Sequence, residues 1–413
     1  FDAAVGFFGG VVHGGAGADF MDSADAAKLK PDFAVVSPGV AVAHKLVRGF
    51  ADAGAEIIGE IELAYRLAEG MFIAITGTNG KTTVTGLIGE IMKSIRSDVR
   101  VTGNIGAPLI GAVAGSTADT VFVTEISSFQ LETCTSFAPH ISVILNVQPD
   151  HLERHGDMQG YAESKRRMIE TQAAADFAVL NADDGYVSAM APHTKAEVVF
   201  YSTRGGHVPG AYVRNGMLLV NVNGAENELM RASELPIMGE HNVGNVLAAA
   251  SAAALAGAPK EKVVERIHSF EGFHFRIEKT AEKNGVLYIN DSKGTNLDAT
   301  LAAIRTFAPR PIVLILGGDD KKLDYSRLYE EVKRSVKRVV VLGPGLRRTA
   351  GELSDCGFAS VETAGDMEQA VRAAASAAVP GDVVLLSPAS SSFDLFRNYE
   401  ERGERFNDAV RSL

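Results

Sequence analysis

The sequence predicts an α/β fold with several domains, mainly parallel sheets and a mixed sheet in the middle of the chain. Short β-branched segments alternate with alanine-rich stretches of helical composition, which is typical of parallel α/β sheets. The 413 residues are too many for one ordinary core and favour two or three domains. Changes in the pattern place domain borders near residues 69 and 274, the second after an alanine-rich helix at residues 243–256.

Several apolar segments are candidates for buried strands. They are residues 33–36, 72–76, 121–125, 141–147, 177–181, 287–290, 312–316, 339–342 and 383–386. Residues 212–220 alternate around Asn215 and Gly216, a dipeptide typical of two-residue β-hairpins. This antiparallel piece lies between the parallel regions, so we expect a mixed middle sheet.

Composition and charge argue against some functional classes. With 46% hydrophobic and 22% charged residues, the chain has the composition of a soluble globular protein. A net charge of −11 argues against nucleic-acid binding, and no apolar segment approaches the ~20 residues of a membrane-spanning helix. Cys134 and Cys356 cannot form a disulfide framework, so we expect a cytoplasmic location. The chain begins at Phe1 without an initiator Met, and we expect its N-terminal domain to be truncated or divergent.

A phosphate-binding loop is predicted at residues 76–83 (TGTNGKTT), between a strand and a helix that begins near Val84. Small residues let backbone N–H groups approach phosphates, and the helix N-terminus adds positive potential. Lys81 would reach the β- and γ-phosphates of ATP, and the Thr82 hydroxyl would bind Mg²⁺. The usual pattern has another glycine at position 75, where this chain has Ile75. An ordinary glycine turn is the alternative, which the Gly-Lys-Thr-Thr sequence in this context disfavours.

Acidic and imidazole side chains follow two of the predicted strands. Glu125 ends one strand, and Asp150 and His151 follow another. The carboxyl ends of parallel strands form the ligand-binding edge of an open sheet, so all three would lie beside the phosphate loop. Taken singly, Glu125 could cap the helix expected at residues 126–133, and His151 could be an ordinary turn residue. Their joint placement favours a two-metal centre for phosphoryl transfer.

Several segments resemble the Mur ligases of peptidoglycan synthesis. They are the phosphate loop and residues 125–132 (EISSFQLE), 146–153 (NVQPDHLE) and 239–245 (GEHNVGN). Folylpolyglutamate synthases share the loop and parts of the rest. The branch of the family that adds D-glutamate is resembled most closely, through residues 290–296 (NDSKGTN), 316–321 (LGGDDK) and 386–406 (LSPASSSFDLFRNYEERGERF).

This resemblance implies three domains and a mechanism. A Rossmann-like domain for the UDP-sugar would span residues 1–68, a central ATPase domain residues 69–273, and a Rossmann-like domain for D-glutamate residues 274–413. The alanine carboxylate of UDP-N-acetylmuramoyl-L-alanine would attack the γ-phosphate of ATP, giving an acyl phosphate and ADP. The amine of D-glutamate would then displace phosphate. We expect a monomer that uses ATP and two Mg²⁺ ions and does not enter membranes.

The resemblance also implies roles for individual residues. Catalysis would involve Lys81, His151 and Lys165. ATP would be bound by Gly77, Thr78, Asn79, Gly80, Lys81, Thr82, Thr83, Asn242, Asn245, Arg276 and Asp291. Mg²⁺ would be held by Thr82, Glu125, His151 and Lys165, the last as a carbamate. The UDP-sugar side would use Asn104 and Ser127. D-Glutamate would be bound by Lys293, Thr295, Lys321, Ser392 and Phe393.

Some of these residues, and the function itself, also have an alternative interpretation. Lys165 alone would be interpreted as a solvated helix lysine, and Ser392 as a helix N-cap before Asp394. Phe275 precedes Arg276 where the family usually has histidine, and no uridine ligand can be assigned. Folylpolyglutamate synthase, another Mur ligase, or a switch protein that hydrolyses ATP without ligation are the alternative functions. The C-terminal motifs argue against all three.

Overall fold

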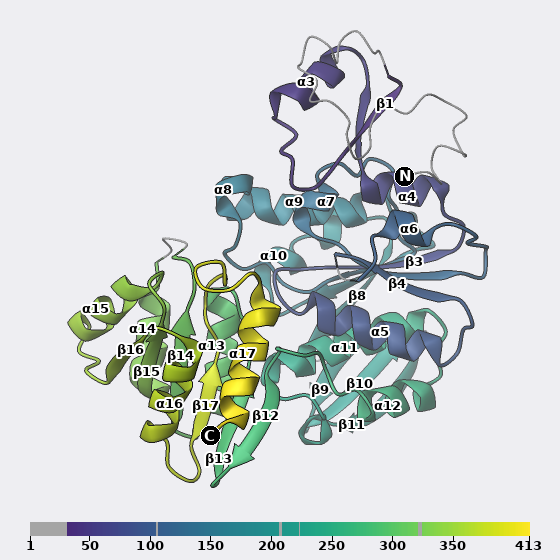
Figure 1. The fold of residues 1–413 in the computed structure, drawn as a ribbon. Coiled ribbons are helices and arrows are strands. Elements are labelled where there is room, and N and C mark those ends of the chain that lie inside the picture. Colours follow the sequence, from purple (N-terminus) through teal and green to yellow (C-terminus); the bar gives the residue numbers. More distant parts are fainter. Residues whose placement is uncertain (1–30, 105, 206–208, 223, 321–323) are drawn as a thin grey trace. The chain divides into compact units, whose positions relative to one another are not determined.

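The computed structural model describes residues 31–413 except residues 105, 206–208, 223 and 321–323 (Figure 1). The chain divides into two compact units. The first unit contains Phe1–Glu234 and Gly244–His268, and the second contains Leu235–Val243 and Ser269–Leu413. The domain borders near residues 69 and 274 stay a prediction.

The first unit opens with a small parallel sheet of β1 (Phe33–Val36) and β2 (Glu56–Gly59). Helix α3 (Lys45–Asp52) connects these strands, and α4 (Glu60–Leu67) follows β2 directly. This β-α-β arrangement brings the end of β1 beside α4.

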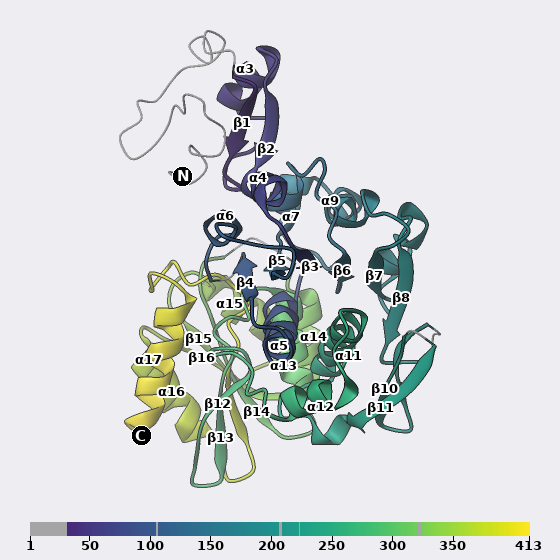
Figure 2. The ribbon, with the colours of Figure 1, turned by 90° about the vertical axis from the view of Figure 1, so that its right-hand side faces the viewer.

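A nine-stranded mixed sheet forms the centre of the first unit, in the order β11-β10-β9-β8-β7-β6-β3-β5-β4 (Figure 2). The strands from β4 to β9 pair in parallel, whereas β10 is antiparallel to both of its neighbours. The turn between β9 and β10 places Asn215 at φ 53° and Gly216 at φ 75°, as a two-residue hairpin requires. The strands are β3 (Met71–Thr76), β4 (Val99–Gly103), β5 (Val121–Glu125), β6 (Ile141–Ile144), β7 (Phe177–Asn181), β8 (Glu197–Ser202), β9 (Gly210–Arg214), β10 (Met217–Val222) and β11 (Ala225–Arg231).

Helices cover both faces of this sheet, which explains the continuous apolar sequence of β3. Apolar side chains of α4, α7 and α9 form one core with Phe72 and Ala74, whereas α5 and α12 lie on the other face (Figure 1). The helices of the first unit are α5 (Lys81–Lys93), α6 (Leu109–Ala112), α7 (Ser128–Leu131), α8 (Leu152–His155), α9 (Met158–Glu170), α10 (Gly185–Ser188), η1 (Ala191–His193), η2 (Ala232–Glu234), α11 (Glu240–Leu255, which begins in the second unit) and α12 (Lys260–His268).

The second unit has a six-stranded sheet in the order β12-β13-β17-β14-β15-β16, parallel except for β12. Helices α13 and α14 pack on one face, and α16 and α17 pack on the other. The elements are β12 (Glu278–Lys283), β13 (Val286–Asn290), α13 (Leu297–Phe307), β14 (Ile312–Gly317), α14 (Ser326–Ser335), β15 (Val336–Leu342), α15 (Arg347–Asp355), β16 (Val361–Ala364), α16 (Met367–Ala377), β17 (Val383–Leu386) and α17 (Tyr399–Arg411).

These sheets confirm the predicted α/β class, the mixed middle sheet and the hairpin. No helix in the described part of the chain is both long enough and apolar enough to cross a bilayer. Strand β6 ends at Ile144, three residues before the predicted end at residue 147, because the chain turns there toward the phosphate loop.

Candidate active site

The phosphate loop follows β3, and its backbone needs glycine at two positions. Gly77 has a φ of 154° and Gly80 a φ of 88°, which side chains disfavour. A Cβ at Gly80 would lie 2.4 Å from Oδ1 of Asn245, so the asparagine packs directly on the loop. Helix α5 begins at Lys81, whereas the sequence predicts a start near residue 84. Thr82 and Thr83 therefore lie in its first turn.

The segment after β6 holds the loop from the other side. Asn146 accepts from the N–H of Thr78 through its carbonyl oxygen (2.9 Å) and from the N–H of Asn79 through its side chain (2.8 Å). The N–H of Gln148 donates to the Thr78 hydroxyl (3.0 Å), and the Asn79 amide donates to the Gln148 side chain (2.8 Å). We did not predict these two supports, although both lie in the segment at residues 146–153 that carries the family resemblance.

Two lysines meet at the loop. Lys81 Nζ donates to the carbonyl oxygens of Gly77 (2.8 Å) and Thr78 (2.9 Å), and Lys165 Nζ donates to the same Gly77 oxygen (3.1 Å). Lys165 is only 1% exposed, and its Nζ lies 4.4 Å from the centre of the Tyr161 ring. Burial, and then the charge of Lys81, hold the pKa of Lys165 well below its ordinary value. The interpretation as a solvated helix lysine is therefore wrong.

Glu125 is the last residue of β5, beside the loop, and one of its two carboxylate oxygens accepts a hydrogen bond. Its Oε1 accepts from the side-chain amide of Asn104 (2.9 Å), whose backbone N–H also donates to the Glu125 carbonyl (2.8 Å). Within the described residues, Oε2 is buried and accepts no hydrogen bond. Glu125 does not cap α7, because Ser127 does so in a capping box with Gln130. The capping interpretation of Glu125 is therefore wrong.

His151 lies on a turn next to an aromatic ring. Its backbone is left-handed (φ 53°), and its side chain is 42% exposed. The imidazole lies 4.9 Å from the Phe129 ring, whose other neighbours include the Arg154 guanidinium at 4.4 Å. His151 Nε2 is 3.6 Å from Asp150 Oδ2. The ring is thus held in place while one side stays accessible.

A cavity of about 700 Å³ in the first unit collects many of these groups. A volume of this size suits a nucleotide-sized ligand. Of the predicted residues, it is lined by Thr78, Lys81, Asn104, Ser127, His151 and Lys165. Residues 35–39 at the end of β1 and just after it, Glu60 of α4, and residues 128–130 of α7 also line it.

The donor set beside the loop fits Mg²⁺. The buried Glu125 Oε2 lacks a hydrogen-bond donor among the described residues, and a carboxylate oxygen is a preferred Mg²⁺ ligand. No three His, Cys, Asp or Glu side chains of the described residues lie close enough to form a metal site alone. A Mg²⁺ ion bound by Glu125 would need further ligands of other kinds, such as hydroxyls, phosphate oxygens, a carbamate or water.

The residues predicted to bind ATP are divided between the two units. Asn245 lies in the first unit, whereas Asn242, Arg276 and Asp291 lie in the second. Asp291 accepts from the Ser387 hydroxyl (2.7 Å) and the Ile277 N–H (3.3 Å). Burial raises the pKa of Asp291 to about 7, although Ser387 and Arg276 act against this.

The predicted D-glutamate residues that are described follow the carboxyl ends of strands in the second unit. Lys293 Nζ lies 3.4 Å from the centre of the Tyr399 ring, and the Thr295 N–H donates to the Lys293 carbonyl (2.8 Å). Ser392 is buried, and Phe393 beside it is 71% exposed. Ser392 is not a helix N-cap, because no helix begins there and Asn398 caps α17. Lys321 lies outside the described residues.

A buried arginine that we did not predict joins these loops. Arg402 of α17 is 0% exposed and donates to the Ser292 carbonyl (2.8 Å) and hydroxyl (3.0 Å). It also donates to the carbonyl oxygens of Gly317 (3.2 Å), Ser390 (3.2 Å) and Ser391 (3.3 Å). One guanidinium thus holds together the segments after β13 and β17 and the last residue of β14. An arginine flanked by charged residues gives no sequence signal of burial.

Comparisons with known proteins agree with this architecture. A family model described as the Mur ligase middle domain matches residues 75–253, and one described as Mur ligase, glutamate ligase domain matches residues 275–390. The MurF ligase of Thermotoga maritima, solved in complex with ADP, superposes with a TM-score of 0.63 at 19% identity, covering 94% of this chain and 97% of that one.

Two curated relatives share far more sequence. The UDP-N-acetylmuramoylalanine–D-glutamate ligase of Pelotomaculum thermopropionicum is 44% identical over 94% of this chain and 85% of its own length. The enzyme of the same name from Acidobacterium capsulatum is 44% identical over 92% of this chain and 82% of its own length. The chain therefore belongs to the UDP-N-acetylmuramoylalanine–D-glutamate ligase family of the Mur ligases.

Proposed function

We propose that the chain joins D-glutamate to UDP-N-acetylmuramoyl-L-alanine in an ATP-dependent reaction through an acyl phosphate. The observation that carries this proposal is the cavity in which the phosphate loop shares one lining with Asn104, Ser127 and His151. Such a cavity lets the terminal phosphate of ATP and a second substrate meet. The names of the relatives supply the identity of that substrate and of the amino acid.

In the first step, an oxygen of the alanine carboxylate forms a bond to the γ-phosphorus of ATP, and the bond to the leaving ADP oxygen breaks. Lys81, fixed above the loop by two carbonyl oxygens, would neutralise charge on the phosphates. Gly77, Thr78, Asn79, Gly80, Thr82 and Thr83 are the proposed loop contacts of the phosphates. The N–H groups of Thr78 and Asn79 donate to Asn146, so the N–H groups at the start of α5 would bind the phosphate oxygens. Asn104 and Ser127 would contact the sugar substrate.

Thr82, Glu125, His151 and Lys165 are the proposed Mg²⁺ ligands, Lys165 after conversion to a carbamate. Mg²⁺ would reduce the repulsion between the phosphate oxygens and the attacking carboxylate. Carbamate formation needs an uncharged amine, and the lowered pKa of Lys165 favours that form. The new carboxylate would lie beside the phosphate loop, because Lys165 Nζ already contacts Gly77.

In the second step, the amine of D-glutamate bonds to the acyl carbon, phosphate leaves with its oxygen, and the amine loses a proton. Lys293, Thr295, Lys321, Ser392 and Phe393 are the proposed D-glutamate contacts. Asn242, Asn245, Arg276 and Asp291 are the proposed nucleotide contacts outside the loop. We further propose a monomer. We also propose a cytoplasmic location, since the chain's two cysteines, both unpaired, suit a reducing compartment.

Phosphate release from ATP tests this function. We expect release only when UDP-N-acetylmuramoyl-L-alanine and D-glutamate are both present with Mg²⁺. Release supported by L-glutamate, L-alanine or a folate in place of D-glutamate would instead indicate a related ligase. Release that does not depend on D-glutamate would refute the ligase and favour a simple ATPase.

A further inference from the structure

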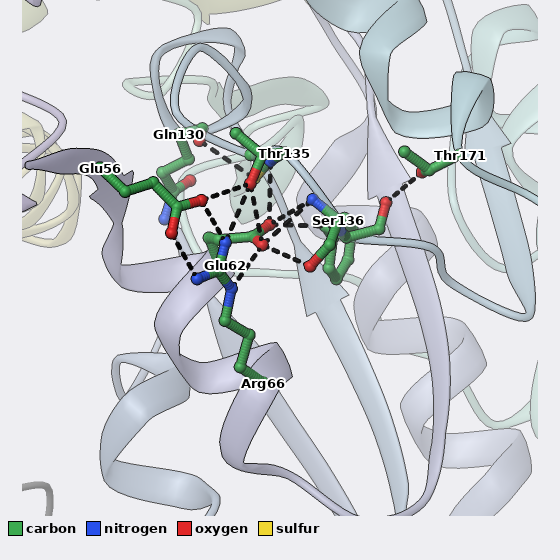
Figure 3. Close-up of polar contacts among 9 residues, drawn as sticks. Glu56, Glu62, Arg66, Gln130, Thr135, Ser136 and Thr171 are labelled. Atoms are coloured by element: carbon green, nitrogen blue, oxygen red, sulfur yellow. Dashed lines mark hydrogen bonds and ion pairs between the residues drawn. The ribbon is translucent and has the colours of Figure 1, made fainter. Parts of the chain in front are cut away.

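A buried carboxylate on α4 is bound by the segment that follows α7. Glu62 is 0% exposed, yet its oxygens accept from the consecutive N–H groups of Thr135 (3.0 Å), Ser136 (3.0 and 3.1 Å) and Phe137 (3.0 Å). The hydroxyls of Ser136 and Thr135 also donate to Oε1. Figure 3 shows these contacts converging on the one side chain.

Arg66 balances the buried charge. Its Nε donates to Glu62 (2.8 Å), and its other nitrogens donate to Glu56 of β2 (2.8 and 2.6 Å) and to the Thr135 hydroxyl (3.0 Å) (Figure 3). Burial raises the pKa of Glu62, but the donors from Ser136, Thr135 and Arg66 outweigh it and hold the pKa below its ordinary value. A buried charge is tolerated when it is satisfied in this way, and removing part of the network is costly.

The network connects two walls of the cavity. Helix α4 follows β2, which pairs with β1, and residues 35–39, which include the end of β1, line one wall. Helix α7 supplies residues 128–130 of the other wall, and the segment bound by Glu62 follows it. A second contact lies close by: the Gly59 N–H donates to the Thr133 carbonyl (3.2 Å), and a Cβ on Gly59 would lie 2.3 Å from the Thr133 hydroxyl.

The phosphate loop has separate supports. Asn146 and Gln148 hold its backbone from the segment after β6. Among the described residues, the hydrogen bonds of Glu62 go to Arg66 and residues 135–137 and not to the loop. Loss of the Glu62 network should therefore alter the walls formed by β1 and α7 while the ATP phosphate site keeps its shape.

We propose that Glu62 is a positioning residue for the UDP-sugar substrate: it fixes residues 35–39 against α7 and so sets the width of the cavity. The proposal rests on the proposed function, because it takes the UDP-sugar as the ligand of these walls. Glu62 is not itself among the residues that line the cavity.

The test is Glu62→Gln, which keeps the shape but places an amide donor against N–H donors. We expect the Kd and KM for UDP-N-acetylmuramoyl-L-alanine to rise about tenfold, because a mispaired buried polar group costs on the order of a tenfold equilibrium change. The Kd for a non-hydrolysable ATP analogue and the KM for ATP should stay within about twofold of the wild type. Isothermal titration and steady-state kinetics well below the melting temperature measure both.

Glu331→Gln is the matched control. Glu331 is also a buried carboxylate, with Arg305, Arg334 and Ser335 as donors, but it lies on α14 in the second unit. The Glu331→Gln variant should have a lower melting temperature and an unchanged affinity for the UDP-sugar. If Glu62→Gln does not fold, Ser136→Ala replaces it, since it removes a single donor and should raise the Kd about two- to threefold.

Each outcome decides the proposal. Wild-type affinity for the UDP-sugar in a folded Glu62→Gln protein, or in Ser136→Ala when that variant stands in, would overturn it. Equal losses of ATP and UDP-sugar binding would also overturn it. Wild-type protein that binds no UDP-sugar in the same titration would refute the proposed function instead, and this inference with it.

Discussion

Lys165 and Gly77 are joined by a hydrogen bond of 3.1 Å from Nζ to the carbonyl oxygen, and Lys81 donates to that same oxygen at 2.8 Å. A lysine from α9 and a lysine from the phosphate loop thus share one acceptor in a buried place. Burial and the neighbouring charge hold the pKa of Lys165 well below its ordinary value. The lowered pKa favours the uncharged amine, which is the form that reacts with CO₂.

Lys165→Ala should reduce ligation by at least about a hundredfold, because it removes the group proposed to become a Mg²⁺-binding carbamate. The fold should persist, since the change relieves the crowding of two amines. Wild-type turnover should also fall in CO₂-free buffer and recover with bicarbonate. Phosphate release and melting temperature are the measurements, with the exposed Lys93→Ala as control. Near-normal turnover of Lys165→Ala would contradict the proposed carbamate role.

Glu125→Gln should raise the Mg²⁺ concentration needed for half-maximal turnover by about tenfold or more. Its amide oxygen can still accept from Asn104, so the loss is that of the negative charge and of the free carboxylate oxygen. A Mg²⁺ titration of turnover measures the effect. Glu90→Gln, on the exposed side of α5, is the control. An unchanged Mg²⁺ dependence would remove Glu125 from the metal site.

Gly80→Ala should weaken ATP binding about tenfold and lower the free energy of unfolding by about 1–2 kcal/mol. The φ of 88° disfavours alanine, and its Cβ would lie 2.4 Å from Asn245 Oδ1. Titration with an ATP analogue and thermal unfolding measure the two effects. Gly111→Ala on α6 has open space around its Cβ and should change neither. Normal ATP binding by Gly80→Ala would show that the loop tolerates the displacement of Asn245.

Asp291 should give the second unit a distinctive pH dependence. Its pKa rises from 3.8 in the unfolded chain to about 7 in the fold, so the folded state holds a proton more tightly. The stabilisation is complete below pH 3.8, declines as pH rises and is lost above about pH 7. Asp291→Asn should flatten this decline in unfolding midpoints measured against pH, whereas Asp408→Asn on the exposed side of α17 should not. An identical pH profile for Asp291→Asn would mean that Asp291 is ionised in the fold.

Arg402→Lys should raise the KM for D-glutamate with little change in the KM for ATP. Lysine cannot reach Ser292, Gly317 and Ser391 together, so the segments that carry the proposed D-glutamate contacts would separate. We expect a loss of stability of about 2–4 kcal/mol as well. Arg405→Lys, on the exposed side of the same helix, is the control. A KM for D-glutamate equal to that of the wild type would limit Arg402 to a structural role.

The strands that the sequence predicts and those it misses differ in their place in the sheets. Every predicted strand of the two large sheets pairs with a neighbouring strand on each of its two edges, as β3, β5, β14 and β17 do. The edge strands β4, β11, β12 and β16 were all missed. An edge strand such as β12 (EKTAEK) pairs on one side only and carries solvated side chains, so it lacks the apolar sequence of a buried strand. The sequence also does not predict the interior strand β8 or strand β2 of the small sheet.

The α/β class, the phosphate loop and the resemblance to the Mur ligases can all be predicted from the sequence alone. These follow from local patterns: runs of apolar residues, a glycine-rich loop at a strand end, and long contiguous motifs. The tertiary structure is needed to show that Lys165 is buried beside Lys81 and that Glu62 and Arg402 are buried charges. It also shows that one Glu125 oxygen has no donor among the described residues. Sequence reasoning places a charged residue at the surface, because the groups that satisfy it when buried come from segments tens of residues away.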